Sequence, residues 1–432
     1  MMRWIERLLI LFIFLIPWQA RFILRAGELG DSFWEYGTVA LYATDVLFVV
    51  ILLLSGIWWI KNQKSKIKNQ NDNAELKNNL QLTTYNLLLI TGYIAFSIFW
   101  SFDKTVSFYA ALKFLEGVAL FFIVRTVQSY EVGPHKMGGP TSRILWAFVA
   151  SAVAQSVLAI AQFFTQSVFA WPFSGIAPQD PSDLGVSVVQ FADERWLRAY
   201  GSFPHPNLLG AFIAIAAIIL FTQLFRSRDE ESGIKNHELG TLKFILHNSY
   251  FIILITGLFF TFSRTAWIAF FVGLVIYAIQ TKAWREKIFL QLTLLLVVTG
   301  TILTVLFFPL VRTRVGGGSR LEIQSNQERT TGYREAMQLI KKHPFVGVGI
   351  GNYTVAVARE LRLHDPVWSY QPAHNVFLLI LSELGIFGLA LFLIFFWRLK
   401  NLQLTTYYYH LSSSPSSITL FGCFIRVYFF YG

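Results

Sequence analysis

The feature that most constrains this chain is a series of apolar runs, each about 20 residues long and almost free of charged side chains. A helix rises about 1.5 Å per residue, so about 20 residues are what a helix needs to cross the hydrocarbon core of a bilayer. A membrane-spanning strand would be about half as long and would alternate apolar with polar residues. The runs therefore predict an all-α fold, a polytopic transmembrane helical bundle.

The overall composition supports a membrane protein. The chain is 54% hydrophobic and only 14% charged, whereas soluble domains carry about 25% charged residues. The single cysteine, Cys423, excludes an internal disulfide framework and provides no metal-ligand spacing. No Walker loop, dinucleotide fingerprint or zinc spacing is found in the sequence. We therefore predict no cofactor and no metal, and a bilayer rather than nucleic acid as the partner of this +11 chain.

Ten of the runs are convincing spans and an eleventh is weak, so residues 1–432 are predicted to form a single polytopic membrane domain of 10–11 spans. The predicted spans are 7–25, 39–60, 82–101, 106–125, 144–168, 207–225, 244–262, 265–281, 288–308 and 375–397, with 417–431 as the weak one.

The orientation of the spans follows from the lysines and arginines of the short loops, which favour the cytoplasm. The loop after the second predicted span, "KNQKSKIKNQNDNAELKNN", carries five lysines, and every second loop after it is also basic. Because the basic loops alternate in this way, two longer segments, 169–206 and 309–373, are predicted to lie on the outer face. An active site on them would face the periplasm or cell exterior of a cytoplasmic (inner) membrane protein.

One arginine interrupts the long apolar stretch 244–281, which is about twice the thickness of a membrane. The stretch is therefore predicted to fold as two spans with a tight outer turn at "FSRT", where Ser263 or Thr265 can cap the second helix. Arg264 then lies at the outer membrane boundary, where its guanidinium costs far less than at the bilayer centre. An arginine that merely snorkels at a helix end is the alternative reading.

The extracytoplasmic segment 309–373 has nine lysines and arginines against five acidic residues, a net charge of +4. A segment this long escapes the orientation rule, and its charge indicates an anionic ligand. Tyr333, Ala336, Met337 and Ile340 have helical spacing and predict an amphipathic helix that ends before a proline. A second short helix, "YTVAVARELRL", follows the flexible turn predicted at "GVGIGN".

Several residues near the predicted outer face could bind a substrate or carry chemistry. His374 is at the start of the 375–397 span, where the field of the helix N-terminus disfavours a protonated imidazole and leaves it able to accept a proton. Arg195, Arg198 and His205 precede the span 207–225. The alternatives are an interfacial histidine at 374 and, around residue 205, a plain turn capped by Asn207.

Three further charged residues lie within predicted spans. Lys113 and Glu116 are three apart on one helix and are predicted to form an ion pair. Glu383 lies nine residues below His374 in the same helix. A structural role is favoured for Lys113, Glu116 and Glu383, and a proton relay through them is the more specific alternative.

Arginines with one or two histidines favour a reaction whose leaving group is already activated and negatively charged. A sugar carried on a lipid diphosphate fits this pattern, because arginines can hold the diphosphate while a histidine deprotonates the acceptor hydroxyl. A transporter or flippase of lipid-linked sugars is the alternative. It would require deep charges and broken helices in paired positions. A non-catalytic scaffold would leave the positive outer segment without a purpose.

Four motifs in order resemble the O-antigen ligase and O-antigen polymerase family of polysaccharide assembly. They are "RAYGSFPHPNLLGAF", "TFSRTAWIAF", "YREAMQLIKKHPFVGVGIGNY" and "PAHNVFLLILSELGIFGLALF", and they cover about residues 190–397. The chain after residue 400 does not resemble the further spans with which family members usually continue.

The resemblance implies a metal-independent glycosyltransferase of cell-envelope and lipopolysaccharide biosynthesis. Its donor would be a lipid-linked oligosaccharide on undecaprenyl diphosphate, and its acceptor a hydroxyl of lipid A core, a glycan chain or a protein. By motif, Arg198 and Arg264 would hold the diphosphate, and His374 would act on the acceptor as base or positioner. Arg334 and Glu383 match recurrent family residues. Whether such a chain is a ligase or a polymerase stays open.

Overall fold

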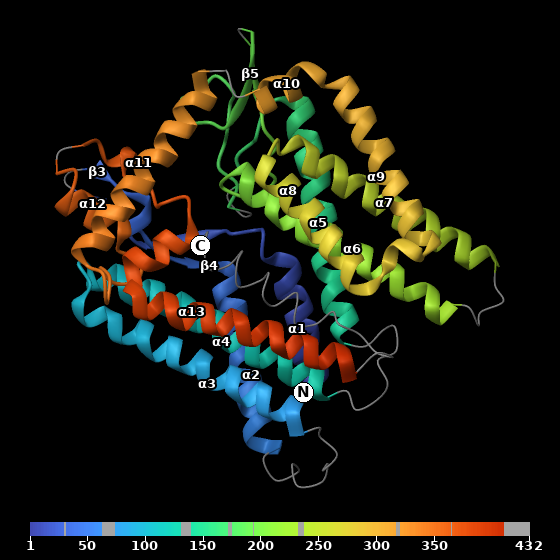
Figure 1. Cartoon of the computed structure of the whole chain (residues 1–432), viewed down its shortest axis with the longest axis horizontal. Coiled ribbons are helices and arrows are strands. Elements are labelled where there is room, and N and C mark those ends of the chain that lie inside the picture. The colour runs from blue at the N-terminus through green and yellow to red at the C-terminus, as the bar shows by residue number, and fades with distance from the viewer. Residues whose placement is uncertain are drawn as a thin grey trace. The chain divides into compact units, whose positions relative to one another are not determined.

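The computed structural model describes residues 1–29, 32–62, 74–130, 140–171, 175–192, 194–231, 237–316, 320–363 and 365–409. Backbone contacts divide the chain into two compact units (Figure 1). Unit 1 contains Arg21–Thr126 and Ile323–Gly432, and unit 2 contains Met2–Ala20 and Val127–Glu322. The predicted site residues are divided between the two units, so each is described by itself.

Long helices make up most of both units. Unit 1 has α2 (Ala43–Asn62), α3 (Ala74–Ser97), α4 (Lys104–Tyr130, its last turn in unit 2), α12 (Tyr353–Glu360) and α13 (Val376–Tyr409). Unit 2 has α1 (Met2–Leu15), α5 (Pro140–Thr165), α6 (Pro206–Glu231), α7 (His237–Phe260), α8 (Arg264–Thr281), α9 (Lys287–Leu306) and α10 (Phe308–Gly316). Helix α11 (Arg320–Lys342) begins in unit 2 and lies mostly in unit 1.

Eight helices within the described residues are long and apolar enough to cross a membrane, and α7 adds a shorter apolar stretch, Asn248–Phe260. Helix α9 exposes the apolar side chains of Leu294, Val298 and Ile302 at four-residue spacing, a surface suited to lipid. The all-α, polytopic membrane fold is therefore confirmed. The predicted span 417–431 and Cys423 lie outside the described residues.

The first predicted span, 7–25, is wrong in its second half. Helix α1 ends at Leu15, two residues before Pro17, whose ring removes a backbone donor and cannot continue a helix. Residues Arg21–Arg25 form strand β1, which pairs antiparallel with β4 (Val39–Tyr42). The run looked continuous because apolar residues of the helix and of the strand follow one another closely.

Two more antiparallel strand pairs are present in the described chain. Strand β2 (Glu28–Leu29) pairs with β3 (Ser32–Phe33) in unit 1, and β5 (Val188–Phe191) pairs with β6 (Glu194–Leu197) in unit 2. The second pair lies in the predicted outer segment 169–206, directly before α6.

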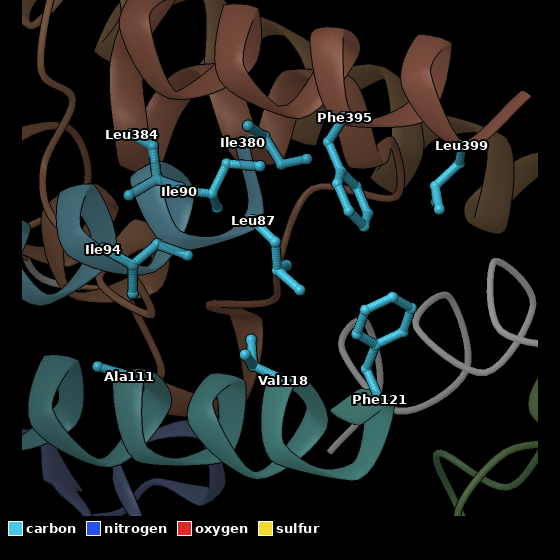
Figure 2. Packing of buried hydrophobic residues seen from close by; sticks show 10 residues of the cluster. All are labelled: Leu87, Ile90, Ile94, Ala111, Val118, Phe121, Ile380, Leu384, Phe395 and Leu399. Atoms are coloured by element: carbon cyan, nitrogen blue, oxygen red, sulfur yellow. The ribbon is translucent and has the colours of Figure 1, made fainter. Parts of the chain in front are cut away.

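The core of unit 1 is formed where α3, α4 and α13 pack together (Figure 2). Leu87, Ile90 and Ile94 of α3 recur at helical spacing and point toward Ile380 and Leu384 of α13. This packing fixes the N-terminal half of α13, the part that follows His374.

Helix α13 is broken at Gly385, which has φ 65° and ψ −170°. A side chain is excluded there because a Cβ would lie 2.1 Å from the carbonyl oxygen of Phe345. The backbone N–H groups of Val348 and Gly349 donate to carbonyl oxygens that the break exposes, those of Ser382 (3.0 Å) and Glu383 (2.8 Å). The segment predicted as a flexible turn, "GVGIGN", therefore packs into the break in α13.

In unit 2, α5 packs against α1, α6 and α7, while α6 packs against α8. Gly210 allows α6 and α8 to approach closely, because a Cβ on it would lie 2.9 Å from Ala266 and 3.1 Å from Ser263. The start of α8 is thus held against the first turns of α6. This contact places the elements that carry the arginines described next.

Candidate functional site

The turn between α7 and α8 is formed as the sequence predicts. Helix α7 ends at Phe260 and α8 begins at Arg264. Ser263 is the N-cap, and its hydroxyl oxygen accepts from the backbone N–H of Ala266 at 3.4 Å. Phe262 is fully buried and has φ 45°, an uncommon conformation for a residue with a side chain. The predicted cap is confirmed, and Arg264 is the first residue of its helix.

Arg198 is buried beside this turn, with 5% of its surface exposed. Its Nε donates to the carbonyl oxygen of Thr261 at 2.8 Å, and its Nη2 donates to the side-chain oxygen of Asn207 at 2.7 Å. These bonds join the segment after β6 and the start of α6 to the turn that carries Arg264. Arg198 thus lies against the turn that carries Arg264, within unit 2. A shared ligand site for the two arginines stays a prediction.

Arg314 joins the same turn from α10. Its Nε donates to the carbonyl oxygen of Phe262 at 2.9 Å, and Nη1 of Arg264 donates to the carbonyl oxygen of Arg314 at 3.1 Å. Sequence reasoning did not single out Arg314. The only sequence feature that could have indicated Arg314 is its position in "VRTRVGGG", directly after a predicted span, and Arg312 has an equivalent position.

Arg198, Arg264 and Arg314, here called the arginine cluster, bring three guanidinium groups to a four-residue turn. Each guanidinium donates to a backbone carbonyl oxygen and keeps its positive charge. Planar, permanently charged groups held in this way are suited to bidentate contact with phosphate or carboxylate oxygens.

His205 has a structural role beside the cluster. Its Nδ1 accepts from the backbone N–H of Asn207 at 3.1 Å, and its Nε2 lies 3.1 Å from the hydroxyl of Ser187. Because a backbone N–H can only donate, Nδ1 carries no proton, and a neutral ring has its proton on Nε2 and donates to Ser187. Asn207, predicted as the cap of α6, is wrong in that role. The helix starts at Pro206, so His205 occupies the cap position.

Arg195 lies on β6 and is half-buried. Its Nη2 donates to the carbonyl oxygen of Asp183 at 2.8 Å, which ties β6 to the loop before β5. A substrate-binding role for Arg195 and for His205 stays a prediction.

In unit 1, His374 is exposed and lies two residues before α13. The following residue, Asn375, is the cap, since its side-chain oxygen accepts from the N–H groups of Phe377 (3.0 Å) and Leu378 (3.2 Å). Desolvation by neighbouring protein atoms and the positive charge of Arg329 lower the pKa of His374 below its usual value, while Glu328 acts in the opposite direction. The ring thus favours the neutral form, as expected, and the causes are desolvation by neighbouring protein atoms and the charge of Arg329.

Helix α11 confirms the predicted amphipathic helix, but the predicted buried face is partly wrong. Glu335, Ala336 and Leu339 are buried, whereas Tyr333 and Met337 are exposed, at 40% and 46%. Ala336 and Leu339 pack in one cluster with Val348 and Tyr353, and the hydroxyl of Tyr353 donates to the Gly332 carbonyl at 3.0 Å. Arg334 is accordingly exposed, and its substrate-binding role stays a prediction.

Part of the positive charge of the predicted outer segment is neutralised within the segment itself. Arg362 pairs with Glu335 at 2.9 Å and also with Asp365. Lys342 pairs with Glu360 at 3.1 Å, and the same carboxylate lies 2.9 Å from His343. These residues hold α11 and α12 together, so the excess charge available to a ligand comes from other basic residues.

Residues 249–393 match the family model described as O-Antigen ligase. The matched residues include Arg264, Arg314 and His374. The chain therefore contains an O-antigen ligase family region at residues 249–393. The resemblance seen in the sequence is thereby confirmed, and the matched region runs from the middle of α7 to α13.

A curated relative gives an independent comparison. The chain is 26% identical over 221 residues to the O-antigen ligase of Salmonella typhimurium (strain LT2). The alignment covers 48% of this chain and 49% of that protein, so this chain spans about half the length of the curated relative it matches. No solved structure matches the chain.

Glu383, inside the O-antigen ligase family region, binds the backbone of the docked glycine-rich segment. Its carboxylate, on a half-buried residue, accepts from the N–H groups of Gly351 (3.0 Å) and Tyr353 (3.2 Å). Tyr353 is the first residue of α12, so the carboxylate also lies at the positive end of that helix. The structural role favoured for Glu383 is supported, and contact with a substrate stays a prediction.

Glu383→Ala is expected to destabilise the protein by about 2–5 kcal/mol, because two buried N–H groups would lose their acceptor. Glu383→Gln keeps one acceptor oxygen and should cost less. Thermal unfolding in detergent measures both, with Glu328→Ala on the exposed face of α11 as the control. Equal melting temperatures for Glu383→Ala and the control would show that these bonds do not stabilise the docked segment.

The predicted ion pair between Lys113 and Glu116 is confirmed at 3.2 Å. Lys113 also pairs with Asp45 at 2.6 Å and lies over the ring of Tyr42. Asp45 was not foreseen, although it is the one acidic residue in the apolar run 39–60. These contacts join α2 to α4 and satisfy charges that would be costly in a membrane without partners.

Proposed function

We propose that the protein transfers a glycan from undecaprenyl diphosphate to a hydroxyl acceptor on the outer face of the cytoplasmic membrane. The arginine cluster at the α7–α8 turn is the observation that carries this proposal, because three arginines hydrogen-bonded at or beside one turn suit a diphosphate. Similarity to the O-antigen ligase family over residues 249–393 supports a glycan as the transferred group.

In this proposal the arginine cluster binds the donor's diphosphate and stabilises the charge that develops as it leaves. Electrostatic stabilisation by groups already in place is worth most at this point of a reaction. Arg195, His205, Arg334 and Glu383 remain proposed contributors to substrate binding. The donor is a lipid-linked oligosaccharide, and the acceptor is lipid A core, a growing glycan chain or a protein.

His374 is proposed as the general base or positioner of the acceptor. The acceptor oxygen attacks the anomeric carbon, the bond from that carbon to the phosphate oxygen breaks, and the lipid diphosphate leaves with the electron pair. The acceptor proton passes to the neutral imidazole. This mechanism requires the donor, bound by the arginine cluster, and the acceptor, bound at His374, to be bound at the same time.

A transporter of lipid-linked sugars is the alternative, and one observation bears on it. Transporters of this kind bind their cargo at broken helices within the membrane. The break in α13 is occupied by the chain's own backbone, since Val348 and Gly349 bond to the exposed carbonyl oxygens. The glycan transferase is therefore the better proposal.

The lowered pKa of His374 leads to a pH prediction. A base is active when unprotonated, so a lowered pKa keeps transfer active to a lower pH. Arg329→Gln removes a positive charge near the imidazole, which raises the pKa and moves the acidic limb of the pH–rate profile to higher pH. Glu328→Gln should move the limb to lower pH. Identical limbs in all three proteins would rule out control by these charges.

The proposed function is tested in a strain that lacks the gene, complemented with wild-type protein or with inactive variants, by gel analysis of surface glycans. Loss of attached chains while free lipid-linked polymer accumulates would identify a ligase. Loss of long chains would identify a polymerase. Surface glycans that do not depend on the gene would contradict glycan transfer altogether.

A further inference from the structure

Helix α10 is joined to the α7–α8 turn by two hydrogen bonds that run in opposite directions. The side chain of Arg314 donates to the backbone of the turn, and the side chain of Arg264 donates to the backbone of Arg314. Each arginine therefore fixes the position of the other.

The carbonyl groups of the turn are shared in an ordered way. Thr261 accepts from Nε of Arg198, and the next residue, Phe262, accepts from Nε of Arg314. The residue after the cap is Arg264 itself. Arg198 and Arg314 thus donate to the carbonyl groups of two successive residues that precede Arg264 in the turn. The second of these residues, Phe262, has φ 45°. Such a conformation persists only where its surroundings hold it.

Arg314 is distinguished by its contacts, because Arg312 is chemically identical and lies on the same short helix. Arg312 is exposed, whereas Arg314 is half-buried against the turn. Helix α10 also packs against β5 and follows α9. The orientation of Arg264 consequently depends on α10, which lies 50 residues further along the chain.

We propose that Arg314 is a positioning residue of the donor site, which sets the geometry of Arg264 and adds a third positive charge for the diphosphate. This inference rests on the proposed function and extends it to α10. The ligand class is a lipid diphosphate. The charge of Arg314 contributes to its binding, and the backbone bond of Arg314 orients the guanidinium of Arg264.

The test measures donor KM and kcat for purified full-length protein in lipid nanodiscs, with an undecaprenyl-diphosphate-linked oligosaccharide as donor. Arg314→Leu is expected to raise KM by about ten- to a hundredfold, the effect of losing one charge-assisted hydrogen bond. Arg314→Lys keeps the charge but not the planar Nε donor, and should raise KM less. Arg312→Leu makes the same change of charge on the same helix and should retain the wild-type KM.

Unfolding and failure of the proposed function are separated by two further measurements. If thermal unfolding shows that Arg314→Leu does not fold, the inference is tested with the folded Arg314→Lys variant instead. A wild-type donor KM for Arg314→Lys would then overturn the inference. Arg264→Ala is measured in parallel. An inactive Arg264→Ala beside a wild-type KM for Arg314→Leu overturns the role of Arg314 alone, whereas normal activity of Arg264→Ala overturns the proposed function.

Discussion

His374→Ala is expected to lower the rate of glycan transfer by about 10²–10⁴-fold, the usual contribution of a positioned general base. The residue is exposed just before the cap of α13, and no described backbone bond depends on its ring, so the protein should fold and insert normally. Transfer is measured with purified protein, lipid-linked donor and acceptor. Membrane insertion is measured by fractionation.

The matched control is His343→Ala, which removes an imidazole paired with Glu360 at the end of α11. That variant is expected to lose some stability and to keep most of its transfer activity. If His374→Ala transferred glycan at the wild-type rate, the acceptor role of His374 would be excluded. An interfacial histidine, the alternative that the sequence leaves open, would then remain.

Arg264→Ala is expected to reduce transfer by about 10²–10³-fold, the usual effect of removing one group that stabilises developing negative charge. Arg264→Lys should recover little, because an ammonium cannot reproduce the planar contact of a guanidinium that is oriented by the Arg314 carbonyl. Both variants keep Ser263 as the cap, so α8 should still begin at the same place. The assay is the one used for His374.

Arg285→Ala is the control for Arg264, because Arg285 is an exposed arginine after the opposite end of α8. Its activity should match that of the wild type. Near-normal transfer by Arg264→Ala would instead support the snorkelling interpretation, in which the guanidinium only reaches water at a helix end.

Features that depend on local pattern could be predicted from the sequence. The length of the apolar runs predicts most of the spans, and a run twice as long as a membrane is thick predicts the turn at Ser263. The i, i+3 spacing of Lys113 and Glu116 predicts their ion pair. Each of these depends on residues close together in the chain, where helix geometry leaves few alternatives.

Features that depend on which elements pack together could not be predicted. Tyr333 and Met337 have helical spacing like the face of α11 that is buried, and tertiary packing with residues such as Val348 and Tyr353 selects between the faces. Arg314 and Arg312 are equivalent in sequence, and only the α7–α8 turn distinguishes them. The expected meeting of the arginines with His374 stays a prediction.

Binding of undecaprenyl diphosphate without a glycan to the purified protein tests the central claim most directly. Titration of wild-type protein, Arg198→Ala, Arg264→Ala and His374→Ala in nanodiscs separates binding from transfer. The account predicts that both arginine variants lose most of their affinity, and that His374→Ala binds like the wild type. Equal affinity in all four proteins would show that the arginine cluster does not hold a diphosphate, and would contradict the account.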